Sequence, residues 1–264
     1  KNKKIPGKKF TYIDLFRKII PKTKYLGFKI NKDWIAFHLK RDVWISEKFK
    51  FFFGKKREPN EKITQHHKNI AAALQFRLEE IVLYNLKKIK KKYQINYLCI
   101  AGGVGLNCSL NGKIHDSKLF KKIFVQPAAG DSGLALGGLY LSIKNNINQN
   151  KKLNKEFNNY LGSKFTDNEI KRTIISKKLK YTKPLNIYKS VAKLIKDGKI
   201  IAWFQGSSEF GPRALGNRSI LCKPYPANMK DYLNKRVKFR EYFRPFAPAV
   251  LEEKFKEYFD LRQT

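Results

Sequence analysis

The sequence is poor in cysteine, methionine and acidic residues, and it contains no long apolar run. Three cysteines stand among 264 residues, at Cys99, Cys108 and Cys222, and none belongs to a CxxC pair. An odd, widely spaced set of thiols argues against a disulfide framework or a cysteine zinc site and favours a reducing, cytoplasmic compartment. No apolar stretch approaches the roughly 18 residues of a membrane span, so we expect no membrane partner.

Negative charge is scarce relative to positive charge. Lysine and arginine number 57 against 21 acidic residues, which gives a formal net charge of +36. The basic residues are mostly Lys, spread from end to end and mixed with abundant Asn and Ile, a composition typical of coding bias. A nucleic-acid-binding surface would instead concentrate charge on one face with interleaved aromatics. We expect no specific nucleic-acid partner, and a basic nucleic-acid-binding module is the non-enzymatic alternative.

The middle of the chain alternates apolar stretches with glycine-marked turns. A broad apolar stripe at helical spacing predicts one long helix over about residues 63–93. Two short apolar strands follow, each ending at Gly or Pro and each leading into a helical pattern. We expect strands at 97–100 and 123–125, and helices at 105–115 and from the 130–133 turn to about 143. This order predicts an α/β fold with a parallel or mixed sheet.

A polar, Asn- and Lys-rich stretch predicts a linker at 148–165, between an N-terminal domain at 1–147 and a C-terminal domain at 166–264. In the second domain we expect helices at 168–176, 187–196, 229–237 and 251–258, and a strand at 200–204. Residues 1–60 have weak periodicity. Their apolar members are expected in a core or a pocket wall: Trp34, Phe37, Val43, Trp44 and Ile45.

The first candidate site is the AGGVGLNCSLNG segment at 101–112, where Gly102 and Gly103 end a strand. Paired glycines let a phosphate approach the backbone at a helix N-terminus. Asn107 and Asn111 are four residues apart, so both amides lie on one helix face. The alternative is a tight turn with two capping or solvated asparagines. The segment is not a Walker loop, because no Gly-Lys-Ser/Thr follows.

The second candidate is PAAGDSGLALG at 127–137, in which Asp131 stands where a helix begins after a strand. Ligands of α/β proteins bind at the carboxyl ends of strands. A carboxylate at this position can ligate a metal, or it can cap its own helix. Spacing alone favours the cap.

The third candidate is GSSEFGPRALGNRS at 206–219, followed by a second basic group at Lys238, Arg240 and Arg244. Arginine is unusual in a chain whose charge is nearly always Lys, and guanidinium forks bind phosphate bidentately. Pro212 fixes φ just before Arg213. The alternative is a set of arginines paired with Glu209 and Glu241. We favour a functional anion site.

Two adjacent histidines, His66 and His67, stand near the expected start of the long helix. Adjacent helical positions face different directions, so the two make a poor metal pair. We expect a structural or surface role for both.

Taken together, these motifs resemble the O-carbamoyltransferases of nodulation-factor and antibiotic biosynthesis. The resemblance rests on four blocks in order, AGGVGLNC (101–108), PAAGDSG (127–133), EFGPRALGNRSIL (209–221) and REYFRPFAP (240–248), and covers roughly residues 60–255. Gly105 departs from the family, which usually has Ala there.

The resemblance implies a fold for each half. The first would be the C-terminal half of an actin/sugar-kinase-like domain, similar to the tRNA threonylcarbamoyl transferases. The second would be part of an α+β domain similar to threonylcarbamoyl-adenylate synthases. A tRNA threonylcarbamoylation factor is the alternative enzyme, and the EFGPRALG block on the same chain argues against it.

The resemblance also implies a division of labour. Carbamoyl phosphate and ATP would form carbamoyl-adenylate, and the carbamoyl group would pass to a hydroxyl of a sugar or natural-product acceptor. The residues implied to bind carbamoyl phosphate and the ATP phosphates are Arg213, Arg218, Lys238, Arg240 and Arg244. Those implied to hold the nucleotide are Gly102, Gly103, Asn107, Asn111 and Ser219. Asp131 would ligate a divalent metal, iron or magnesium, which reverses the preference from spacing.

Two blocks of the family are absent, an upstream His-x-x-x-His pair and a downstream His-Val-Asp-Gly-Thr segment. The chain also begins at Lys1 without an initiator methionine, and no signal-like apolar segment follows. We therefore expect a fragment with an incomplete metal site that does not turn over alone. Neither the acceptor nor the oligomeric state is predicted by the sequence.

Overall fold

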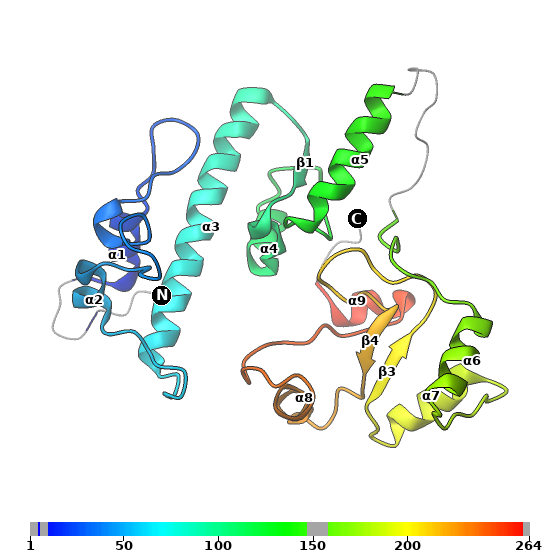
Figure 1. Cartoon of the computed structure of the whole chain (residues 1–264). Helices are drawn as coiled ribbons and strands as arrows, with labels where there is room; N and C mark the ends of the chain where they lie inside the picture. The colour runs from blue at the N-terminus through cyan, green and yellow to red at the C-terminus, as the bar shows by residue number, and fades with distance from the viewer. Residues whose placement is uncertain (1–4, 6–9, 147–157, 261–264) are drawn as a thin grey trace. The chain divides into compact units, whose positions relative to one another are not determined.

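The structure, a computed structural model, describes residue 5, residues 10–146 and residues 158–260 (Figure 1). Contacts divide the chain into two units, Lys1–Gln126 and Pro127–Thr264. Residues 148–157 of the predicted linker at 148–165 lie outside the described residues, and the limits of the domains stay a prediction.

The first unit begins with two short helices, α1 (Tyr12–Ile19) and α2 (Glu47–Phe53), separated by the 3-10 turn η1 (Lys32–Trp34). Thr11 caps α1 in a reciprocal capping box with Asp14, which satisfies free N–H groups at the helix start. The apolar face of α1 is buried with Trp34 and Phe53 in one core. Neither helix was predicted, because each is too short for a clear helical period.

Helix α3 (Gln65–Tyr93) is 29 residues long and agrees with the predicted long helix. Its first half packs on α1, where Ala73 joins the core of α1 and α2. Its second half contributes Leu86 to a separate core with Leu110, Ile114 and Phe120. One helix therefore supports both halves of the first unit.

The predicted β-turn-α-β order is confirmed after α3. Strand β1 (Tyr97–Ile100) leads into η2 (Gly103–Leu106) and α4 (Cys108–Asp116), and strand β2 (Lys122–Val125) lies parallel to β1. The register pairs Tyr97 with Lys122 and Ile100 with Val125. The helix starts later than predicted because the 3-10 turn takes the residues from Gly103 to Leu106.

The predicted placement of apolar residues in 1–60 is only partly right. Trp34 is 3% exposed and belongs to the core. Phe37 and Trp44 are 57% and 73% exposed, so the prediction of a buried role is wrong for both. Their ring centroids lie 6.3 Å apart, with the ring planes tilted by 46°. Aromatic composition indicated a core here, but no regular element presents these two side chains to the interior.

The second unit contains α5 (Ser132–Asn146), α6 (Asp167–Ser176) and α7 (Ile187–Lys196) before its two strands. Strand β3 (Ile201–Phe204) pairs antiparallel with β4 (Arg218–Leu221). The chain then forms α8 (Met229–Arg236), η3 (Glu252–Lys254) and α9 (Phe255–Tyr258). Strand β4 was not predicted, because its residues were assigned to the loop. Helix α7 packs beside β3 (Figure 1).

The mixture of helices with small parallel and antiparallel sheets agrees with the predicted α/β class. All three cysteines are free, as expected. Within the described ranges, no helix combines the length and the apolarity needed to cross a membrane.

Candidate functional site

The glycine- and arginine-rich motif forms the connection between two paired strands. Phe204 of β3 lies opposite Arg218 of β4, and Gln205 N donates to Asn217 O at 2.9 Å. The intervening residues therefore form a closed loop, which we call the arginine loop (residues 205–217). Gly206, Gly211 and Gly216 have positive φ angles of 56°, 115° and 113°. A hairpin thus brings both ends of the motif together and leaves its centre to project.

The carboxylate of Glu209 holds this loop from inside. Its side chain is fully buried, and Oε1 accepts hydrogen bonds from Leu215 N at 2.6 Å and Asn217 N at 2.9 Å, with Arg218 N at 3.4 Å. Burial raises the pKa of Glu209, but the N–H groups of Leu215, Asn217 and Arg218 outweigh it and hold the pKa below its ordinary value. Glu209 is therefore a carboxylate that gathers three backbone donors.

Arg218 belongs to the framework of the loop. Its Nε lies 3.2 Å from Glu209 Oε2, an ion pair that is not aligned as a hydrogen bond. One of its terminal nitrogens donates to the carbonyl of Gly211. The predicted alternative, an arginine paired with Glu209, is confirmed for Arg218.

Arg213 lies between Gly211 and Arg218 in the chain and is exposed. Among the described residues it has no hydrogen-bond or ion-pair partner. Its guanidinium is thus available to a ligand, whereas that of Arg218 is partly engaged. The two arginines were predicted to play the same role, and the structure gives them different surroundings.

The second motif lies against the arginine loop. A Cβ atom at Gly211 would stand 3.0 Å from the Cβ and 3.1 Å from the Cα of Ala128, so only glycine fits this approach without movement. Ala128 and Ala129 are buried. The PAAG segment at 127–130 therefore forms part of the wall behind the loop, a proximity that spacing did not predict.

Residues 159–163, which the sequence placed in the linker, also bind the loop. Phe210 N donates to Asn159 O at 2.7 Å, and Ser208 N donates to Ser163 O at 2.9 Å. The hydroxyl of Tyr160 donates to Leu215 O at 3.1 Å. The loop is thus fixed from within by Glu209 and from outside by this neighbouring segment.

The second basic group is organised by Asn234, a residue that the sequence analysis did not single out. Asn234 is completely buried, and its Nδ2 donates to Tyr242 O at 3.2 Å and Arg244 O at 2.9 Å. Its Oδ1 accepts from Arg240 Nε at 2.7 Å. A lone Asn in a short helix carries no sequence signal for such a role.

The three cations of this group differ in their partners. The guanidinium of Arg240 lies 4.6 Å from the ring centroid of Phe246, in addition to its bond to Asn234. Arg244 Nε pairs with Glu241 at 2.8 Å, which confirms the predicted alternative for that residue. The side chain of Lys238 is exposed and has no partner in the described parts of the chain.

The first motif has the predicted turn geometry, and its asparagines are mostly engaged. Gly102 has a positive φ of 100°, and Gly103 opens η2. Asn107 caps α4 by accepting from Leu110 N at 3.0 Å and also pairs with Gln75. The Nδ2 of Asn111 donates to Gly105 O at 2.8 Å, while its buried Oδ1 lacks a hydrogen-bond partner among the residues described.

Asp131 is exposed and stands just before α5, at the predicted position. Across the described ranges, no group of three His, Cys, Asp or Glu side chains could hold a metal ion. A single exposed carboxylate does not by itself make a metal site. A metal-ligand role for Asp131 stays a prediction, as does the binding of a nucleotide by Ser219.

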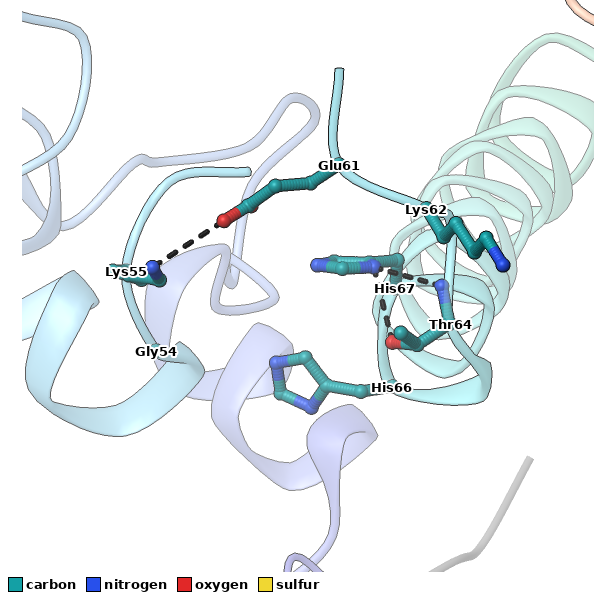
Figure 2. A pocket seen from close by; sticks show the side chains of 7 residues that line it. All are labelled: Gly54, Lys55, Glu61, Lys62, Thr64, His66 and His67. Atoms are coloured by element: carbon teal, nitrogen blue, oxygen red, sulfur yellow. Dashed lines mark hydrogen bonds and ion pairs between the residues drawn. The ribbon is translucent and has the colours of Figure 1, made fainter. Parts of the chain in front are cut away.

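The two histidines lie at a pocket of about 450 Å³ in the first unit (Figure 2). His66 bridges two elements, because its Nδ1 lies 2.7 Å from the Tyr12 hydroxyl and its Nε2 lies 2.7 Å from Phe53 O. His67 accepts the backbone N–H of Thr64 at 3.0 Å and thereby caps α3. Figure 2 shows the ring of His67 in the middle of the pocket. These contacts agree with the structural role expected for both residues.

Two family models match the chain. One, described as carbamoyltransferase N-terminus, matches residues 12–139, and the other, described as carbamoyltransferase C-terminus, matches residues 192–264. The first range contains the two glycine-marked turns. The second contains the arginine loop and the group around Asn234.

Curated relatives match most of the chain. It is 39% identical over 253 residues to nodulation protein NolO of Bradyrhizobium diazoefficiens. The aligned region covers 95% of the chain and 44% of NolO. It is 40% identical over 251 residues to nodulation protein NolNO of Sinorhizobium fredii, and the aligned region covers 94% of the chain and 35% of NolNO. An uncharacterized protein of Synechocystis is 39% identical over 227 residues, with 83% and 37% covered. The chain spans less than half the length of these relatives.

Proposed function

Because the chain belongs to the carbamoyltransferase family, we propose that it takes part in ATP-dependent O-carbamoylation. Carbamoyl phosphate, ATP and water would give carbamoyl-adenylate, phosphate and pyrophosphate. The hydroxyl of a small acceptor, a sugar or natural product, would then attack the carbamoyl carbon, and AMP and a proton would leave. A cytoplasmic location is part of this proposal.

The observation that carries the proposal is the exposed guanidinium of Arg213. It lies at the centre of a loop whose backbone is fixed on the inside by Glu209 and on the outside by residues 159–163. A planar guanidinium binds two phosphate oxygens at once and cannot lose its charge. A fixed, unpaired cation of this kind stabilises the charge that develops on a phosphate as a bond to it breaks.

The other basic residues would act around Arg213 in different ways. Lys238 is exposed, its side chain has no partner among the residues that the structure describes, and it would supply a second positive charge. Arg240 donates to Asn234 Oδ1 and Pro245 O and lies over the ring of Phe246, and Arg244 pairs with Glu241, so both would bind the ligand with their remaining N–H groups. We propose that these residues together bind the phosphates of the donor and of ATP.

The first unit would hold the nucleotide part of the intermediate. Gly102 and Gly103 leave the backbone open at the turn before α4, where a nucleotide phosphate could approach. Asn107 would serve mainly to cap α4, because its side chain is already engaged. No step of the proposed reaction is assigned to a metal.

The test is the substitution Arg213→Ala in the complete gene product. Carbamoyl-phosphate-dependent release of pyrophosphate from ATP should show a KM for carbamoyl phosphate raised by about 10- to 100-fold, the loss expected for one charge-assisted contact. Arg172→Ala is the matched control, because Arg172 is an exposed arginine of α6 without a side-chain partner in the described residues. Its KM should stay at the wild-type value. An equal KM in Arg213→Ala and Arg172→Ala would contradict the role of the arginine loop.

A further inference from the structure

We propose that Glu209 is a positioning residue. It keeps the guanidinium of Arg218 bound to the base of the arginine loop, and it thereby holds the loop in the conformation that exposes Arg213 to the phosphate of the donor. The inference rests on the proposed function, and it deepens it by separating two arginines that the motif presents as equivalent.

Glu209 closes the arginine loop by binding its returning arm. Glu209 Oε1 receives the N–H groups of Leu215 and Asn217 at 2.6 and 2.9 Å, six and eight residues further along the chain. A single carboxylate oxygen therefore fixes the returning arm of the loop against its outgoing arm. Arg213 lies between the two arms, so its Cα position depends on this closure.

The guanidinium of Arg218 already has two partners in the loop, Glu209 and Gly211. Its Nε faces Glu209 Oε2 at 3.2 Å, and a terminal nitrogen donates to Gly211 O. A phosphate can be bound by two N–H groups along one edge of a guanidinium. In Arg218 the edge that includes Nε already faces Glu209, so it is not available for such a contact. Arg218 therefore links the base of the loop to the residue that precedes Pro212, and it does so with 41% of its side chain exposed.

Release of Arg218 to bind a ligand would be unfavourable for Glu209. A fully buried carboxylate without a cation beside it is strongly unfavourable, because burial removes its hydration. If Arg218 turned outward to a ligand, Glu209 would keep its backbone donors and lose its only ion-pair partner in the described residues. Arg213 has no such commitment, so binding a phosphate there breaks no contact within the loop.

The experiment is a double-mutant cycle in the complete gene product, with carbamoyl phosphate as the varied substrate. Glu209→Gln keeps an acceptor oxygen for the backbone donors and removes the charge that holds Arg218. We expect this change to raise KM by about tenfold with a smaller effect on kcat, and Arg218→Gln to do the same. In an Arg213→Ala background, each change should raise KM by less than about twofold, because both act through Arg213.

The outcomes separate this inference from the proposed function. If Arg213→Ala leaves KM unchanged, both are overturned. If Arg213→Ala raises KM but Glu209→Gln or Arg218→Gln still raises it by about tenfold in that background, the proposed function stands and the positioning role is wrong. A purely structural role would lower the unfolding temperature of Glu209→Gln in both backgrounds, and its effect on KM would be the same in both. Arg218 is half-exposed, so Arg218→Gln keeps the test available if Glu209→Gln does not fold.

Discussion

Glu209, Asn234 and Arg77 are the polar or charged residues that lie buried in the described parts of the chain. Each collects backbone groups that come from elsewhere in the sequence: Glu209 the N–H groups of the arginine loop, Asn234 the carbonyls of the second basic group, and Arg77 the carbonyl of Ile20. A buried polar group is tolerated when its partners replace water. At the scale of single residues, these three side chains fix the course of the loops and helix ends that they bind.

The charge of Glu209 should make stability depend on pH. Its pKa lies below the ordinary value of 4.5, so the stability that it contributes is present above that pH and is lost as the pH falls further. Thermal unfolding of the wild type and Glu209→Gln should differ most near pH 7. The difference should shrink as the pH falls from 4.5 through the lowered pKa, because the wild-type carboxyl then becomes protonated too. A difference that stays constant from pH 7 down to the acid limit of folding would contradict the lowered pKa of Glu209.

Gly211 should tolerate no side chain, for two reasons that can be separated. Gly211→Ala places a Cβ on a backbone with φ of 115° and brings it within 3.0 Å of Ala128. Gly216→Ala has a similar φ of 113° and meets open space. Urea unfolding should give a loss of about 1–2 kcal/mol for Gly216→Ala and about 1–3 kcal/mol more for Gly211→Ala. Equal losses would mean that the contact with Ala128 does not constrain the loop.

At the scale of elements, α3 joins two cores, and a buried arginine links it to the end of α1. Arg77 Nε donates to Ile20 O, the carbonyl at the end of α1, at 2.9 Å, and a terminal nitrogen lies 2.5 Å from Glu80 Oε2. Glu80 also pairs with Arg17 at 3.1 Å. The buried cation therefore caps one helix from another and fixes how α1 packs on α3.

Replacement of Arg77 should destabilise the first unit far more than replacement of its exposed neighbour. Arg77→Met leaves Glu80 and the end of α1 without a buried donor, and we expect a loss of about 3–5 kcal/mol in urea unfolding. Arg17→Met removes a partly exposed ion pair with the same Glu80 and should cost less than about 1 kcal/mol. A similar loss in the two variants would contradict the role of Arg77 as a buried cap.

Most elements with a clear period could be predicted from the sequence, and the long-range contacts could not. The 29 residues of α3, the strands beside it and the helices after residue 166 follow apolar spacing and turn residues. Helices α1 and α2 are too short for a period, and β4 lies inside the motif. Position 218 shows the limit for the site: an arginine in a motif looks the same whether it binds a phosphate or a carboxylate nine residues earlier.

At the scale of the whole molecule, the net charge of +36 should act without specificity. Binding to duplex DNA of random sequence should be weaker than about 1 μM at physiological salt and should weaken further as salt rises. Fluorescence anisotropy with a labelled duplex, from 50 to 300 mM salt, measures this directly. Tighter binding that persists at physiological salt would favour the nucleic-acid-binding alternative over the transferase.

The most direct test of the account is the binding of carbamoyl phosphate itself. Isothermal titration calorimetry of the wild type, Arg213→Ala and Arg172→Ala measures the contact without the later steps of the reaction. The account predicts that Kd rises by about 10- to 100-fold in Arg213→Ala and stays at the wild-type value in Arg172→Ala. Equal Kd values in all three proteins, or no binding to the wild type, would contradict it.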